Sequence, residues 1–369
     1  MTTIICILFI LTILILILPA AGAFLSGTSL EVFTTFPPLT EPAAHPSFSW
    51  ILFLLYLLFS LAVLSLIILA ALNGRECSDK SCLRPQKPIP WWGLAALGLL
   101  FLFWVASWTR LSWFEPLQRH TFLPLWLCYI FTVNGFSQSR CGFSLLLARP
   151  LVFLCLFPLS AAFWWVFEYL NQFVDNWFYL GVDYGPLAYS LHASLSFSTV
   201  LPAVYSTRLL LFHSPFMQKR FCGLPPLRPC LPRHPARLVL PASCLGLLGV
   251  GLWPEEMFFL LWLAPLGILV SLKQMAGLPT LFSDMAEGDW RPAISAALAA
   301  LVCGFFWEMW NDHSQAKWIY SIPYVHRYTL FEMPILGYMG YLPFGMLCIE
   351  LVELVFGRNP HTGAASNRR

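Results

Sequence analysis

The sequence predicts an all-α fold, a polytopic transmembrane helix bundle, and three observations lead to this class. The chain of 369 residues is 58% hydrophobic and only 11% charged, whereas a soluble domain carries about a quarter charged residues. Runs such as IICILFILTILILIL and ILFLLYLLFSLAVLSLIILAAL are long enough to cross about 30 Å of hydrocarbon as helices. These runs also lack the apolar–polar alternation of barrel strands, which leaves helices as the structures that satisfy backbone hydrogen bonds in lipid.

Ten apolar segments are predicted to span the membrane. Several are short or contain Pro and Gly, which membrane helices tolerate. The first apolar run ends in LPAAGA, as a cleaved signal would, but MTTII lacks the positive charge of a signal peptide. We therefore expect the first span to be retained. The predicted spans are 3–25, 49–72, 91–109, 121–136, 150–171, 188–212, 238–252, 257–273, 292–311 and 331–356.

The distribution of charge predicts the orientation of these spans. Most of the 21 Lys and Arg residues lie in every second loop and in the C-terminal tail. Because basic loops stay on the cytoplasmic side, we expect both termini to be cytoplasmic. We expect an integral membrane protein of a bacterial inner (plasma) membrane, with membrane lipid around it. No basic domain or binding motif is present, so no nucleic-acid partner is predicted.

Two parts of the chain share a pattern of polar and aromatic residues. A chance match among Leu and Phe is easy in so apolar a chain, but a match in Glu, Asn and Trp is not. The matched positions, offset by 140 or 141 residues, are Glu168 and Glu308, Asn171 and Asn311, Trp177 and Trp318, Tyr179 and Tyr320, Trp113 and Trp253, and Glu115 and Glu255. The sequence therefore predicts an internal duplication.

The duplication divides the chain into five regions. Each repeat holds four spans, an even number, so the repeats run parallel and are related by an axis along the membrane normal. The regions are two N-terminal spans with a basic cytoplasmic loop (1–90), the first four-helix repeat (91–212), a basic cytoplasmic linker (213–237), the second four-helix repeat (238–356) and a cytoplasmic tail (357–369).

The matched residues suggest a site for acid-assisted chemistry on the outer side. Helix positions three apart share a face, so each Glu and its Asn point at one target. A carboxylate partly removed from water can hold a proton near neutrality and act as a general acid. The candidate catalytic residues are Glu168, Glu308, Asn171, Asn311, Glu255, Glu256 and Glu115. The candidates for binding an apolar substrate or a developing cation are Trp165, Trp177, Tyr179, Trp307, Trp318 and Tyr320.

Each of these residues also has a structural interpretation. Trp and Tyr are common anchors at membrane interfaces. A Glu and an Asn at a helix end can bond to loop backbone or to the sister repeat, although ionisable residues in membrane spans are often functional. Glu115 and Glu255 lie in short outer loops, where a solvated role is an alternative.

Metal and cofactor signals are weak. A carboxylate metal site in a bundle usually has Glu-x-x-His, and here the equivalent place holds Asn, so no metal site is predicted. No cofactor is indicated. The cysteines Cys77, Cys82, Cys222 and Cys230 fall in loops predicted to be cytoplasmic, where disulfides are disfavoured. A four-thiol zinc site stays open, although the spacings are not typical of one.

The stretch WPEEMFFLLWLAPL, residues 253–266, resembles the Pro-x-Glu-Glu-x-x-Phe-Phe signature of the membrane-embedded lycopene cyclase domains of carotenoid biosynthesis. Those domains also occur duplicated. Their second motif, an acidic helix residue followed by Trp-x-Phe or Trp-x-Tyr, is similar to Glu168 with Trp177-x-Tyr179 and to its repeat. The resemblance implies proton-initiated cyclisation of a linear carotenoid, with Glu255 or Glu256 as the acid.

Three functions are consistent with these observations. The first is a membrane enzyme that acts on an isoprenoid, carotenoid-like or other lipophilic small molecule. The second is a transporter or lipid flippase built on parallel repeats. The third is a non-catalytic assembly subunit, whose outer motifs dock a membrane-protein partner.

Overall fold

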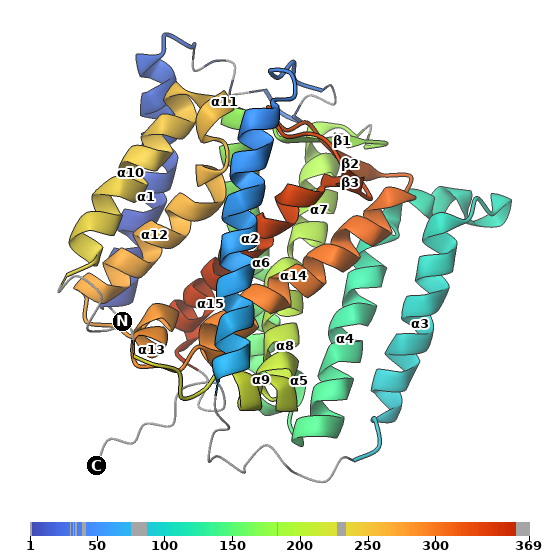
Figure 1. Ribbon diagram of the computed structural model, residues 1–369. Coiled ribbons are helices and arrows are strands. Elements are labelled where there is room, and N and C mark those ends of the chain that lie inside the picture. Colours follow the sequence, from blue (N-terminus) through green and yellow to red (C-terminus); the bar gives the residue numbers. More distant parts are fainter. Residues whose placement is uncertain are drawn as a thin grey trace.

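The computed structural model shows a bundle of helices with short strands at one end (Figure 1). It describes residues 2–29, 31, 33, 35–38, 42–74, 87–182, 184–226 and 234–358. The helices are α1 (Thr2–Leu25), α2 (Trp50–Asn73), α3 (Trp91–Trp108), α4 (Phe122–Cys141), α5 (Leu145–Ala148), α6 (Pro150–Val174), α7 (Pro186–Phe197), α8 (Val200–Phe212), α9 (Pro215–Arg220), α10 (Ala236–Leu252), α11 (Pro254–Met257), α12 (Leu260–Met275), α13 (Leu281–Ala286), α14 (Arg291–Asp312) and α15 (Tyr341–Phe356). The 3₁₀ segments are η3 (Ser112–His120) and η5 (Ile335–Gly340), and the strands are β1 (Trp177–Leu180), β2 (Lys317–Tyr320), β3 (Thr329–Leu330) and β4 (Met333–Pro334).

Seven helical segments of the described chain are long and apolar enough to cross a membrane, as expected of an integral membrane protein. They are Thr2–Leu25, Trp50–Asn73, Trp91–Trp108, Pro150–Val174, Pro186–Phe212, Arg291–Asp312 and Ile335–Phe356. The other three predicted spans fall on α4, α10 and α12. Of these, α10 and α12 are apolar but shorter.

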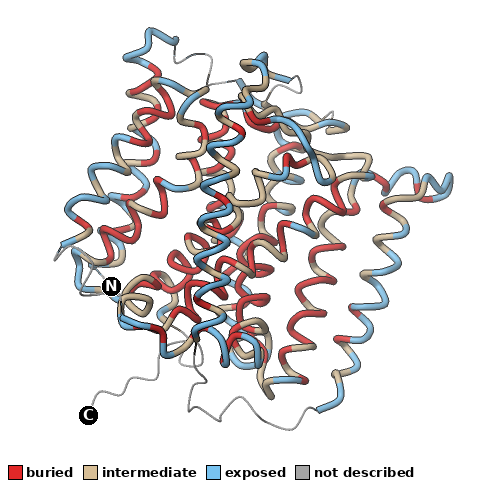
Figure 2. The backbone as a smooth tube through the Cα atoms, in the orientation of Figure 1, coloured by how far each residue is buried: buried red, intermediate tan, exposed pale blue. Residues whose placement is uncertain are grey.

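The outward surface of the bundle is apolar. Figure 2 shows long exposed stretches along the peripheral helices α2 and α3. Leu58 of α2 and Phe101 of α3 are each 62% exposed. A contiguous apolar surface of this kind suits hydrocarbon rather than water.

The centre of the bundle is formed by α14, which packs against α8 and α15. On one side α1 packs against α10 and α10 against α12, while on the other side α3 packs against α4 (Figure 1). We call the end of the bundle that carries β1 and β2 the strand end. The first residues of α1 and the last residues of α15 both lie toward the opposite end.

A two-stranded antiparallel ladder crosses the strand end. β1 pairs with β2, with Trp177 opposite Tyr320 and Tyr179 opposite Trp318. A second, shorter pair joins β3 and β4. The all-α prediction misses these strands, because segments of two to four residues give no measurable periodicity. The ladder joins the segment that follows α6 to the segment that follows α14.

Two glycines let α1 and α10 approach closely. A Cβ atom on Gly22 would lie 2.1 Å from the carbonyl oxygen of Leu248, and one on Gly251 would lie 1.9 Å from that of Pro19. Small residues permit such close crossings of membrane helices. The crossing attaches the first helix to the bundle.

Replacing Gly251 by Leu is expected to push α1 off α10, at a cost of about 1–3 kcal/mol in the free energy of unfolding. Thermal unfolding of the purified protein in detergent measures the loss. Gly98→Leu is the control, because a Cβ atom on Gly98 meets nothing within 4 Å. Equal melting temperatures for the two variants would contradict the tight crossing.

Candidate functional site

Glu168 lies near the end of α6, buried among aromatic donors. Its Oε1 atom accepts hydrogen bonds from the Trp164 ring nitrogen at 2.9 Å, the Trp177 ring nitrogen at 3.2 Å and the Tyr179 hydroxyl at 2.6 Å. Trp164 is one helical turn before Glu168, whereas Trp177 and Tyr179 come from β1. Helix and strand together therefore surround one carboxylate.

Glu308 lies near the end of α14 and is fully buried. Its Oε1 atom accepts hydrogen bonds from the Tyr320 hydroxyl at 2.8 Å and the Tyr341 hydroxyl at 2.6 Å. The Trp318 ring nitrogen donates to the Tyr320 hydroxyl at 3.0 Å. The Oε2 atom is buried without a hydrogen bond in the described part of the chain. Glu308 is thus a buried carboxylate with one oxygen satisfied by two tyrosines.

The two strand tyrosines are suited to donate. Burial raises the pKa of the Tyr179 hydroxyl well above its usual value, and nearby Glu168 raises it further. Burial also raises the pKa of the Tyr320 hydroxyl well above its usual value, and nearby Glu308 raises it further. Both hydroxyls therefore keep their protons at any physiological pH, and can donate to the carboxylates throughout.

The two asparagines hold the strands to the helices. Asn171 accepts from the backbone nitrogens of Asn176 and Trp177, and its side-chain nitrogen donates to the Trp177 carbonyl at 2.8 Å. Asn311 accepts from the Trp318 backbone nitrogen at 2.9 Å and donates to the Trp318 carbonyl at 2.8 Å. Both amides therefore position the strand aromatics that surround the carboxylates.

Substituting Asn311 by Ala is expected to leave the Trp318 N–H and carbonyl without these partners, at a cost of about 1–3 kcal/mol. The change is read from the melting temperature. Ser190→Ala is the comparison, because that hydroxyl bonds only its own helix, at an exposed position. A melting temperature for Asn311→Ala as high as that for the comparison would show that the amide does not hold the strand.

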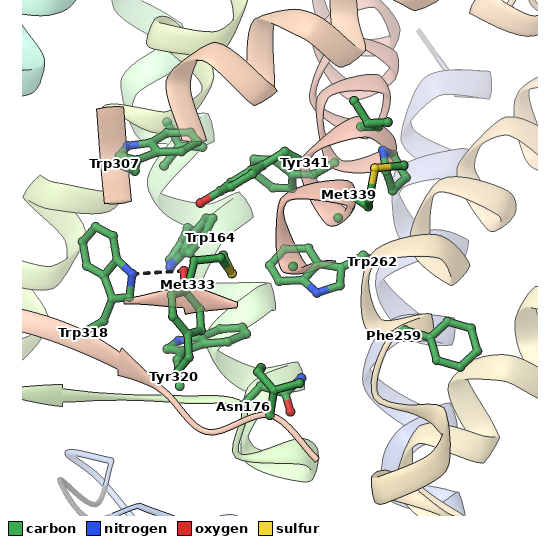
Figure 3. A pocket seen from close by; sticks show the side chains of 18 of the residues that line it. Trp164, Asn176, Phe259, Trp262, Trp307, Trp318, Tyr320, Met333, Met339 and Tyr341 are labelled. Carbon is green, nitrogen blue, oxygen red and sulfur yellow. Dashed lines mark hydrogen bonds between the residues drawn. The ribbon is translucent and has the colours of Figure 1, made fainter. Parts of the chain in front are cut away.

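A cavity of about 1050 Å³ lies against the ladder. Figure 3 shows the rings of Trp307, Trp318, Tyr320 and Tyr341 around it, with Trp262 opposite. Five of the six predicted substrate-binding residues line this cavity: Trp177, Tyr179, Trp307, Trp318 and Tyr320. Glu168 and Glu308 lie behind this wall, and the aromatic groups that donate to them face the cavity.

The sixth predicted residue, Trp165, is not part of this lining. Its ring nitrogen donates to the Ser194 hydroxyl at 3.0 Å, and its ring packs against Phe197. It therefore joins α6 to α7 on another face of the helix.

The remaining predicted acids lie away from the cavity lining. Glu115 is exposed on η3. Glu255 bonds the ring of His45 at 2.8 Å, and Glu256 accepts from the Tyr324 hydroxyl at 3.2 Å. These contacts tie surface segments together at the strand end.

Among the described residues, no three His, Cys, Asp or Glu side chains gather where they could hold a metal ion. Cys222 is disulfide-bonded, contrary to the expectation that this loop would hold no disulfide. Its predicted zinc partners Cys77, Cys82 and Cys230 lie outside the described residues. The disulfide withdraws Cys222 from a four-thiol zinc site.

Sequence reasoning missed a group of buried ion pairs near the opposite end. Lys273 of α12 contacts the Glu350 carboxylate of α15, and Glu350 also accepts from the Leu281 backbone nitrogen. Arg208 of α8 bonds Glu353 at 2.9 Å. The signal was present in the sequence: Glu350 and Glu353, three apart in an apolar run, share one helical face.

Comparison with protein-family models, with curated proteins and with solved structures gives no match for this chain. The resemblance to lycopene cyclase domains therefore stays a prediction.

Proposed function

We propose that this integral membrane protein binds a lipophilic molecule in the aromatic cavity and uses Glu168 and Glu308 as acids toward it. One observation carries the proposal. Each buried carboxylate is hydrogen-bonded by aromatic groups that themselves line the cavity, from Tyr179 on one side to Tyr320 and Tyr341 on the other. A proton held on a carboxyl can pass through a tyrosine hydroxyl to a bound molecule.

The proposal includes the duplication. The order of elements agrees: α3, α4, α6, β1 and α8 correspond to α10, α12, α14, β2 and α15. The ladder also supports it. Trp177 pairs with Tyr320, and their predicted counterparts in the other repeat, Trp318 and Tyr179, pair with each other as well. A twofold axis through the ladder would relate two four-helix repeats, with α1 and α2 added to make ten spans.

The geometry favours Glu168 and Glu308 over the acids that the lycopene cyclase resemblance implies. Glu255 and Glu256 bond surface partners, His45 and Tyr324, and are not part of the cavity lining. An isoprenoid or carotenoid-like substrate fits the aromatic lining, since tryptophan faces stabilise a developing cation.

Transport is the second candidate, and the lining weighs against it. A transport path needs polar groups near the middle of the membrane. The described lining is instead dominated by aliphatic and aromatic side chains. A flippase or an assembly subunit that docks a membrane-protein partner remains the alternative if no turnover is found. We further propose an inner-membrane location with cytoplasmic termini, from the basic loops.

The test is a double substitution, Glu168→Gln with Glu308→Gln, which keeps an acceptor oxygen but removes the acid. Lipid extracts of cells that express the chain are compared by mass spectrometry. The expected result is a product that falls by about 100-fold or more in the double variant. Glu115→Gln, exposed on η3, is the control and should keep the product. Unchanged product from a folded double variant would refute the acid role.

A further inference from the structure

Helix α2 forms one wall of the cavity. Its less exposed residues recur every three or four positions, as expected of one helical face. Tyr56, Ser60, Val63 and Ile67 of this face all line the cavity. Leu58 points away from it and is 62% exposed. One side of α2 thus faces the cavity and the other faces outward. Figure 1 shows α2 at the front of the bundle.

Contacts at its two ends hold α2 in place. At the strand end the Ser49 backbone nitrogen, just before the helix, donates to the Tyr324 carbonyl at 2.8 Å. At the other end Gly74 lies against the backbone of Arg220, where a Cβ atom would come within 1.7 Å of the carbonyl oxygen. Between these two attachments the helix borders the cavity, with the Tyr56 ring packed against Phe258 and Phe259.

The cavity is long as well as apolar. The α2 residues that line it run from Leu55 to Ile67, a rise of about 18 Å along the helix. This is more than half of the roughly 30 Å hydrocarbon thickness of a bilayer. At the far end the lining includes Phe282, Met285 and Trp290. This length matches one lipid chain rather than a compact molecule.

Most polar groups of the described lining lie toward the strand end of the cavity, while the Trp290 ring nitrogen lies at the far end. Along α2 the Ser60 hydroxyl is already bonded to its own helix, at the Tyr56 carbonyl, at 2.7 Å. At the strand end the buried Asn176 side chain lines the cavity, and its Oδ1 atom has no hydrogen bond in the described chain. The charged side chains of the described lining are Arg119 and Lys317, and Lys317 is already paired with Glu332. The unpaired atom at this end is the Asn176 Oδ1 acceptor, so this end suits a polar group that donates a hydrogen bond, such as a hydroxyl.

We propose that the cavity holds a lipid with one long hydrocarbon chain, extended behind α2 toward Trp290, and with a hydroxyl or other hydrogen-bond-donating end beneath the β1–β2 ladder. The assignment rests on the proposed function and specifies its ligand. The chain excludes water from the apolar part, while the Asn176 Oδ1 atom accepts a hydrogen bond from the polar end.

Photoactivatable fatty alcohols of 16 carbons test the assignment on the full chain in lipid nanodiscs. One probe carries its diazirine near the hydroxyl and the other near the methyl end. Peptide mass spectrometry is expected to find the first attached near Asn176 and Tyr320, and the second near Met285 and Trp290. Attachment of both probes at the same positions, or only at outward residues such as Leu58, would overturn the proposed orientation.

A cavity-filling variant separates this inference from the proposed function. Val63→Trp is expected to lower labelling by about five-fold, because an added ring cannot be accommodated together with a chain. Leu58→Trp, on the outward face of α2, should leave labelling unchanged. If an 8-carbon probe labels the cavity as strongly as the 16-carbon probes, the long-chain assignment fails while lipophilic binding stands. No labelling of cavity residues by any probe contradicts both.

Discussion

Replacing Glu350 by Leu is expected to lower the free energy of unfolding by about 3–5 kcal/mol. The substitution leaves the Lys273 ammonium buried without its carboxylate, and the Leu281 backbone nitrogen without its acceptor. An unpaired charge in a low-dielectric interior costs far more than an exposed one. We therefore expect this to be among the most destabilising single changes in the chain.

Thermal unfolding in detergent measures the loss, and two further variants identify its cause. Lys273→Met combined with Glu350→Leu removes both charges and should recover most of the stability. Glu332→Gln breaks the partly exposed pair with Lys317 and should cost at most about 1 kcal/mol. A double variant as unstable as Glu350→Leu alone would show that the ion pair itself is not the cause.

The second large effect is expected at the candidate site. Glu308→Leu removes the acceptor of the Tyr320 and Tyr341 hydroxyls and leaves two buried donors unsatisfied. Each such donor costs about 1–3 kcal/mol, so we expect a loss of roughly 2–5 kcal/mol. Since both tyrosines line the cavity, ligand binding should weaken as well.

The matched substitution Glu308→Gln separates stability from chemistry. Glutamine keeps an acceptor oxygen for the two hydroxyls, so its cost should be about 1 kcal/mol. Unfolding curves of the Leu and Gln variants, measured side by side, give the comparison. Equal stability of the two variants would contradict the role of Glu308 as the acceptor of both tyrosines.

Most of the fold was predictable from composition. Continuous apolar runs of about 20 residues satisfy their backbone hydrogen bonds in lipid by forming helices, so these runs predict a helical membrane protein. The strands were not predictable, because the pairing of Trp177 with Tyr320 joins four-residue segments far apart in the sequence. The exact number of membrane spans and the duplication stay predictions.

The candidate site was predictable in its residue types but not in their arrangement. The spacing of Glu168 and Asn171 indicates a shared helical face, and it led us to expect that both would address one target. In the structure Asn171 bonds the backbone of the β1 segment, whereas Glu168 bonds aromatic side chains. Spacing alone cannot distinguish these partners, because they come from a loop and a strand that follow the helix.

The remaining contacts of the candidate site come from segments that no repeated pattern in the sequence indicates. Tyr341 bonds Glu308 from the start of α15, and the position that the predicted offset of 141 residues matches to it holds an aliphatic residue, Val200. The wall formed by α2 comes from outside the two predicted repeats. A search for repeated residues cannot find either feature.

Identification of the molecules that copurify with the protein tests the central claim most directly. The full chain is purified in nanodiscs from its native lipid, and bound molecules are extracted and identified by mass spectrometry. We expect a long-chain lipophilic molecule, enriched over bulk lipid, with the wild type and with Leu58→Trp but not with Val63→Trp. The same bulk lipids in all three samples would contradict a ligand in the aromatic cavity.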